Sequence, residues 1–178
     1  MNTFIGLQKL WYGDELTTAP TYDGMATLVA SMTEVTNVHQ DTWSYEEADP
    51  ETTEYINELT GQNYYVDMTK QGIPTISFTL GEYEYQQKAD LQGGSVITDG
   101  TGSSAIAVGW QKPMEMNVIY KSIVALSKTG TYIIFPKAQI TGKGDVQEKN
   151  IGLGVQALCC ETGSQTVAPE YWLKKKPA

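Results

Sequence analysis

The residues that could do chemistry are few, and their spacing does not combine them. His39 is the only histidine, and the two cysteines, Cys159 and Cys160, are adjacent. A nucleophile needs a base within hydrogen-bond reach, whereas neighbours on a strand point to opposite faces. We expect His39 to be an ordinary polar residue at a strand end. We expect one buried and one partly exposed thiol without a disulfide, which fits assembly in a cytoplasm.

Carboxylates gather between residues 41 and 61, the most negative segment of the chain. They are Asp41, Glu46, Glu47, Asp49, Glu51, Glu54 and Glu58. Their spacing lacks the Asp-x-Asp-x-Asp-Gly pattern of a calcium loop, so we expect a solvated acidic loop. Two carboxylates could serve a glycosidase, but no spacing singles out a pair. We therefore expect no catalytic residues, no metal site and no cofactor, and we expect that the protein is not an enzyme.

Charge and loop composition argue against nucleotide or nucleic-acid binding. The net charge is −9, and all 12 basic residues are lysines. Specific nucleic-acid binding depends on arginine and on positive patches. Residues 98–104 contain Gly100-Thr101-Gly102, but neither a helix nor Gly-Lys-Ser/Thr follows. We expect a flexible loop there rather than a phosphate-binding loop.

Composition and periodicity favour strands. The chain has 178 residues, 17 glycines and 11 tyrosines, enough for one domain with a hydrophobic core and many turns. Apolar alternation predicts strands over residues 25–40, 62–80 (two strands), 105–110, 114–127 and 132–158. Helices are predicted after Asp49-Pro50, where a capping acid precedes proline, and within 81–94, which ends in glycines. We expect seven to nine strands and one or two short flanking helices: a mainly β single domain over 1–178, a β-sandwich or partly closed barrel.

The hairpin over residues 132–158 is predicted to be central, with its turn at Gly142–Asp145. Its second strand alternates cleanly, but the first has apolar residues on both faces. Ile133 and Phe135 lie opposite the face that carries Tyr132, Ile134, Ala138 and Ile140. A strand that is apolar on both faces needs a cover on each side. We expect a neighbouring subunit to cover Ile133 and Phe135.

The two termini show little periodicity. An N-terminal arm, residues 1–24, carries Trp11 and Tyr12, and these aromatic residues could dock on the core or on a neighbour. We therefore add them to the candidate subunit interface. A C-terminal tail over 168–178 contains Lys174-Lys175-Lys176, predicted to be solvated or to make a salt contact with an acidic neighbour.

Several segments of the sequence resemble the phage tail tube (major tail) protein family. Ile76–Gly81 followed by Ala89–Gly94 is similar to the strand, short helix and double glycine of that family. Lys128-Thr129-Gly130 leading into Ile134–Gly142 resembles its late hairpin, and Gln147–Leu158 its return strand. The resemblance covers about residues 25–160. The loop 98–104 and the arm 1–24 depart from the family pattern.

The resemblance implies a virion structural protein, assembled in the bacterial host cytoplasm and located in the tail. It implies homohexameric rings that stack into a tube, with other tail proteins as further partners. DNA would pass through an acidic lumen without specific binding, since cationic walls would hold phosphates. No membrane span is expected. The loop Asp41–Leu59, with Asp41, Trp43, Tyr45, Glu46 and Glu47 as its candidate contact residues, and the N-terminal arm are available to reach the next ring.

A non-catalytic β-sandwich binding module of the adhesin, carbohydrate-binding or pilus-like class is the alternative. It would explain the tyrosine content and the β architecture equally well. Phe135 offers a test of the interface hypothesis. If Phe135→Asp blocks assembly and leaves the monomer folded, the residue lies at a subunit interface; if the monomer unfolds, it lies in the core.

Overall fold

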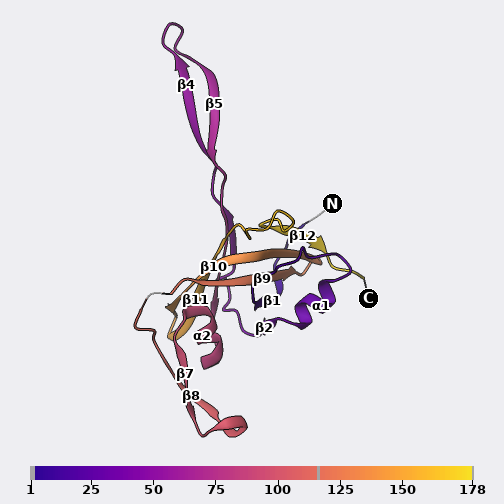
Figure 1. Ribbon diagram of the computed structural model, residues 1–178, viewed down its shortest axis with the longest axis vertical. Helices are drawn as coiled ribbons and strands as arrows, with labels where there is room; N and C mark the ends of the chain where they lie inside the picture. The colour runs from indigo at the N-terminus through magenta and orange to yellow at the C-terminus, as the bar shows by residue number, and fades with distance from the viewer. Residues whose placement is uncertain (1–2, 116, 178) are drawn as a thin grey trace.

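The chain is a mainly β protein whose largest sheet curls into a half-barrel (Figure 1). The computed structural model describes residues 3–115 and 117–177; the first two residues of the arm, the last of the tail and Met116 lie outside this range. Strands take up 51% of the residues and helices 10%, so the expected fold class is confirmed. The elements are β1 (Leu7–Gly13), α1 (Met25–Ala30), β2 (Thr33–Val35), β3 (Ser44–Glu47), β4 (Glu51–Asn57), β5 (Gln62–Lys70), β6 (Pro74–Leu80), α2 (Tyr85–Gln92), β7 (Ser95–Asp99), the 3₁₀ turn η1 (Gly102–Ser104), β8 (Ile106–Gln111), β9 (Ile119–Ser127), β10 (Thr131–Gln147), β11 (Asn150–Cys159) and β12 (Tyr171–Lys174).

The main sheet has the strand order β2-β1-β9-β10-β11-β6-β3, and β12 pairs with the first part of β10. Two separate hairpins, β4–β5 and β7–β8, leave this sheet. The sheet does not close, and its two edges are the short strands β2 and β3. Short edge strands limit unwanted pairing with other chains. The described residues form twelve strands, more than the seven to nine expected, because the two hairpins and the short edges were undercounted.

The strand β10 changes partners at Pro136. Its first residues pair with β9 and β12. From Ala138 onwards β11 replaces β12, while residues 138–140 still pair with β9 after a register shift between Phe135 and Ala138. Proline has no N–H to donate to a ladder, so strands tolerate it where pairing is interrupted. The carbonyl of Pro136 instead accepts a hydrogen bond from the Leu16 N–H (2.9 Å). The irregularity bends β10 and contributes to the curl of the sheet.

The same irregularity inserts one extra residue into β10, so side chains before and after it no longer alternate in phase. The alternation predicted for this strand is therefore wrong. The face of Ile133 and Phe135 continues into Ala138 and Ile140 and packs in the main core. Tyr132 and Ile134 face the other way, into a second and smaller cluster. That cluster contains Trp11, Met25, Val124, Leu126, Tyr132 and Ile134, with Leu28, Val29, Met32, Tyr171 and Leu173 packed against it.

The chain itself therefore covers both faces of β10. The helix α1 and the C-terminal strand β12 supply the second cover, which the sequence analysis assigned to a neighbouring subunit. Ile133 and Phe135 are 1% and 0% exposed within the single chain. The premise that the chain lacks a second layer was wrong, because the segment that forms this layer was predicted to be a strand.

That segment is residues 25–40. Thr27 and Val29 favour a strand by intrinsic propensity, but residues 25–30 form the helix α1, and only Thr33–Val35 is extended. The helix buries Met25 against the second cluster, with Leu28 and Val29 beside it. Burial of this apolar face outweighs propensity, which is a weak effect for a helix of fewer than two turns.

The helix predicted after Asp49-Pro50 is also wrong. Residues 51–57 form the strand β4, which pairs antiparallel with β5. Gly61, predicted to end a helix, instead has φ of +66° in the turn of this hairpin and donates its N–H to the Asn57 carbonyl (2.8 Å). The tertiary fold offers no surface on which an apolar helical stripe could pack here, whereas pairing with β5 satisfies the backbone.

The helix predicted within residues 81–94 is confirmed, and its close packing on β10 explains why residue 142 is a glycine. The helix α2 is capped by Glu84 and ends at Gly93, with Leu91 fully buried. Its last turn lies so close to β10 that a Cβ on Gly142 would stand 2.4 Å from the Leu91 carbonyl oxygen. Gly142 pairs with Val155 in the β10–β11 ladder, so it lies within a strand and the predicted turn at Gly142–Asp145 is wrong. The hairpin turns at Glu148, where φ is +55°.

Both termini are attached to the sheet. The N-terminal segment contains β1, which pairs with β2 and β9 and buries Trp11 and Tyr12. The tail contains β12, and beyond it the Lys176 ammonium lies 2.7 Å from the Asp23 carboxylate. The salt contact considered for the lysine tail is therefore present, although exposed pairs contribute little to stability. The two thiols are free, with Cys159 buried and Cys160 partly buried, as predicted.

The burial of Phe135 predicts the outcome of its substitution. Phe135→Ala is expected to lower the free energy of unfolding by about 3–5 kcal/mol, the usual cost of deleting a buried phenyl ring. Phe135→Asp should prevent folding of the monomer, since an unpaired carboxylate would be buried. Chemical denaturation of the purified monomer measures both. A folded Phe135→Asp monomer with intact stability would contradict the core position.

Gly142 and Gly144 form a matched pair for testing the contact between α2 and β10. A Cβ on Gly142 would collide with the backbone of α2, whereas a Cβ on Gly144 would meet only Ile151 Cγ2, at 3.9 Å. Gly142→Ala should therefore destabilise the fold by about 1–3 kcal/mol, the typical cost of overpacking. Gly144→Ala should be near neutral. Equal thermal melting temperatures for the two variants would argue against close packing of α2.

Candidate assembly surface

The most prominent surface feature is the hairpin β4–β5, here called the arm and defined as residues 51–70. It projects from one side of the half-barrel along the long axis of the molecule (Figure 1). The two strands pair only with each other, not with the main sheet. Both faces of the arm are therefore exposed to solvent in the single chain.

One face of the arm carries a cluster of three tyrosines. Tyr55 lies opposite Tyr65, and a register shift after Tyr55 leaves Tyr64 as an extra residue in β5. The ring of Tyr55 lies 5.7 Å from that of Tyr65 and 6.4 Å from that of Tyr64. A bulge of this kind turns two successive side chains towards the same side of the ribbon. The tyrosines stay largely exposed, with Tyr64 at 70%.

The other face and the tip are apolar as well. Val66 lies opposite Glu54, and Met68 lies opposite Thr52, two positions further along the same face. Leu59 occupies the turn and is 95% exposed. A two-stranded hairpin is marginally stable in water by itself, and exposed apolar patches mark interaction sites. The arm thus exposes apolar side chains on both faces and at its tip.

The arm is also acidic. It has four carboxylates and only one lysine; the carboxylates are those of Glu51, Glu54, Glu58 and Asp67. That lysine, Lys70, pairs with Glu51 at the root of the arm, where the ammonium and carboxylate lie 3.0 Å apart. The outer part of the arm therefore presents apolar rings and aliphatic side chains among negative charges, which favours a partner surface that is apolar and positive.

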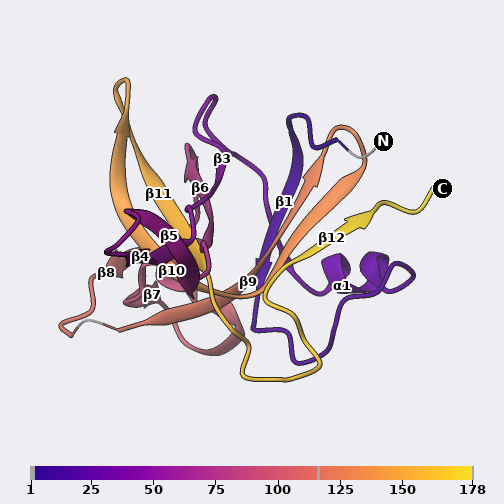
Figure 2. The same ribbon diagram turned by 90° about the horizontal axis from the view of Figure 1, so that it is seen from above.

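A second hairpin, β7–β8, projects from the opposite side of the body. It exposes Ile97, Ile106 and Val108. Figure 1 shows the two hairpins at opposite ends of the long axis, and Figure 2, which looks along that axis, shows them nearly in line. The two ends differ in sequence and shape. A contact between them would join one copy to the next head to tail.

The root of the arm is held firmly by the body. Tyr45 in β3 donates a hydrogen bond from its hydroxyl to Glu170 (3.0 Å), and Trp43 stacks on Phe4 with 6.1 Å between ring centroids. At Gly72 a Cβ would stand 1.8 Å from the Ala48 carbonyl oxygen, so the two root segments touch through their backbones. Only glycine fits such an approach. The arm is therefore directed by a fixed base.

The predicted inter-ring residues lie at this root rather than on the arm. Trp43 and Tyr45 pack partly against the main core, and Glu46 and Glu47 lie on the edge strand β3. Asp41 has φ of +61° in the turn before it. The predicted loop Asp41–Leu59 includes β4 and the tip residue Leu59 but not β5, so Tyr64, Val66 and Met68 were missed.

The four residues predicted to form a subunit interface lie inside the chain. Ile133, Phe135 and Tyr12 pack in the main core, and Trp11 lies in the second cluster with its ring 6.4 Å from that of Tyr132. The Tyr12 hydroxyl donates to Asp90 (3.0 Å). Burial and the nearby Asp90 carboxylate raise the pKa of Tyr12, so its hydroxyl remains protonated. These side chains leave almost no surface to a second copy.

No reactive constellation emerges within residues 3–115 and 117–177. No three His, Cys, Asp or Glu side chains there come together as metal ligands. The ring of His39 lies beside the carbonyl of its neighbour Gln40, with Nδ1 at 3.1 Å from that oxygen. None of the helices in the described part of the chain is long and apolar enough to cross a membrane.

Comparison with known proteins does not assign a family. No protein-family model matches the chain, and no curated protein matches its sequence significantly.

The two thiols should differ in reactivity. Burial, followed by the nearby Glu170 carboxylate, raises the pKa of Cys159 to about 12, so the thiolate that reacts with disulfide reagents is absent at pH 8. One thiol per folded chain, that of Cys160, should react with an aromatic disulfide reagent. Two should react in denaturant. Reaction of both thiols in the native protein at equal rates would contradict the burial of Cys159.

Proposed function

We propose that this protein is a structural subunit that self-assembles into stacked rings, a tube of the phage tail tube kind that conducts DNA. The observation that carries the proposal is the arm, an apolar ribbon with two uncovered faces, aligned with a second apolar hairpin at the opposite end of the molecule. Such an arrangement favours stacking along one axis, because each copy offers different surfaces at its two ends.

The open half-barrel supports lateral association as well. Its edges, β2 and β3, have unpaired backbone groups along their outer sides, and ring closure would place the edge of one copy beside that of the next. A homohexameric ring is the expected form.

The charge suits a conduit for DNA. A net charge of −9 without arginine repels a polyanion, so DNA would move past the subunits without being bound by them. The proposed location is the tail of a virion, assembled in the bacterial host cytoplasm with other tail proteins as partners.

A second candidate is a non-catalytic binding module, for which the tyrosine cluster of the arm is the specific observation. Exposed aromatic rings can stack on sugar rings through their apolar faces. This candidate requires glycan binding by the monomer and no polymer. The tube requires rings or tubes at high protein concentration, visible by electron microscopy and native mass spectrometry. Monomers throughout, under these conditions, would reject the proposed function.

Substitutions in the arm should separate assembly from folding. The double variant Val66→Asp, Met68→Asp adds two charges to a face that we propose is covered in the assembly, so it should abolish stacking. Its circular dichroism and thermal unfolding should match those of the wild type, because both side chains are exposed in the single chain.

Ile5→Asp is the matched control, since Ile5 is an exposed aliphatic residue outside the arm. It should leave assembly unchanged in sedimentation and electron microscopy. If the control and the arm variant are impaired equally, a general charge effect explains the loss and the arm has no special role.

A further inference from the structure

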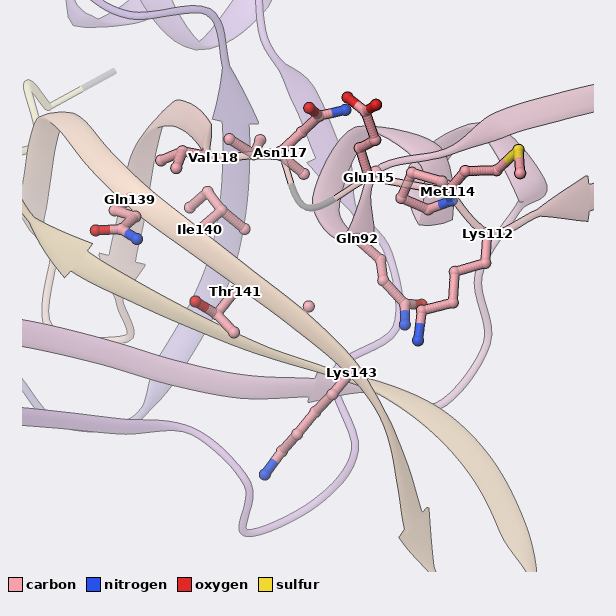
Figure 3. Close-up of a pocket in the computed structure, with 14 residues that line it drawn as sticks. Gln92, Lys112, Met114, Glu115, Asn117, Val118, Gln139, Ile140, Thr141 and Lys143 are labelled. Carbon is pink, nitrogen blue, oxygen red and sulfur yellow. The ribbon is translucent and has the colours of Figure 1, made fainter.

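A pocket beside α2 has the features of a receptor for an aromatic side chain. It has a volume of about 510 Å³ and lies between the end of α2, residues 112–115 and 117–119, and the middle of β10 (Figure 3). This volume is within the about 300–1,000 Å³ typical of ligand pockets. Its walls include the apolar side chains of Pro113, Val118, Ile119 and Ile140.

One polar atom beneath the pocket surface has no partner, and the Gln92 side chain must rotate towards the pocket for a donor to reach it. The side-chain oxygen Oε1 of Gln92 is buried and accepts no hydrogen bond from residues 3–115 and 117–177. Buried polar atoms normally have partners, and an orphan acceptor is unfavourable until a donor reaches it. A ligand that combines an apolar body with one donor at its end would fit. Among side chains, tyrosine has this composition.

The charge of the pocket complements that of the arm. Lys112 and Lys143 line the pocket together with a single carboxylate, that of Glu115, whereas the arm is acidic. Figure 3 shows the Lys143 side chain extending away from the other labelled residues, where it can meet an approaching partner. Opposite charges around an apolar contact favour encounter and fix register.

The position of the pocket also fits a second copy. The arm projects from one side of the body, whereas α2, which carries Gln92, lies on the other side with β7–β8 (Figure 1). An arm therefore cannot reach the pocket of its own chain. A copy shifted along the long axis would bring its own α2 side towards the tip of the arm.

From these observations we infer that the pocket beside α2 receives the arm of the next copy, with Tyr64 inserted so that its hydroxyl donates to Gln92 Oε1. Tyr64 is the most exposed of the three tyrosines and is the extra residue of the bulge. This inference rests on the proposed stacking and specifies its receptor. The acidic arm is then balanced by Lys112 and Lys143.

Cysteine cross-linking tests the contact directly. In a Cys160→Ser background, which leaves only the buried Cys159 thiol, Tyr64→Cys is combined with Val118→Cys at the pocket, where Val118 is 59% exposed. Oxidation of the assembled protein should give a ladder of disulfide-linked dimers, trimers and longer chains on non-reducing gels. The ladder forms because each copy has one arm and one pocket.

The control pair is Tyr64→Cys with Ile151→Cys, placed at the β10–β11 tip, where Ile151 is 66% exposed. This pair should give no ladder. A wild type that never assembles would reject the proposed function and the inference with it. Assembly of the wild type without a ladder for Val118, or with an equal ladder for Ile151, would overturn the inference alone.

A double-mutant cycle tests the hydrogen bond. Tyr64→Phe and Gln92→Leu should each raise the critical concentration for assembly about fivefold, the effect of one lost hydrogen bond per contact. The double variant should be no worse than either single one, because both remove the same bond. Tyr22→Phe, outside the arm, is the control and should have no effect. Additive losses would show that the two residues do not meet.

Discussion

The structure depends on the burial of β10 on both faces. A single strand has apolar side chains on its two sides only if a layer covers each, and β10 obtains the main core on one side and α1 with β12 on the other. Pro136 makes this possible, because the interruption at that residue changes both the partner strands and the buried face. The N-terminal and C-terminal segments are thereby drawn into the fold. The apolar face that the sequence left unexplained, that of Ile133 and Phe135, lies in the main core, whereas α1 and β12 cover the opposite face, that of Tyr132 and Ile134.

Local patterns predicted the elements whose packing follows their own periodicity. The strand β11 alternates over Val155–Cys159, where Gln156 is exposed between buried Val155 and Ala157, and α2 ends at Gly93 as its glycines predict. Prediction failed where the tertiary context decides. Val29 favours a strand by propensity but lies in a helix because of the cluster beside it. Gly142 resembled a turn residue, whereas its role is to admit the backbone of α2. Pro136 is present in the sequence, and it could have predicted that side chains on the two sides of it change faces of β10.

The candidate surface was the least predictable part, because it consists of residues without partners in the chain. Periodicity places Tyr64, Val66 and Met68 on a strand, but it cannot say that the strand leaves the sheet. Pairing of β4 with β5 alone decides this, and that pairing depends on the turn around Gly61 and on the close backbone contact at Gly72. The aromatic residues predicted as outward-facing contacts, Trp43 and Tyr45, precede the arm in the chain. Those aromatic residues instead fix the root from which the arm projects.

Two opposing forces act on an arm of this composition. Its apolar side chains favour association, whereas the acidic surface of the whole chain repels other copies. Repulsion between exposed charges is screened over about 8 Å at physiological ionic strength, while burial of apolar surface needs direct contact. A copy in the right orientation brings lysines of the pocket to the acidic arm, and a copy in the wrong orientation brings acid to acid. The negative charge would then do more than let DNA pass: it would hold the subunits apart until the two ends of the molecule are correctly aligned.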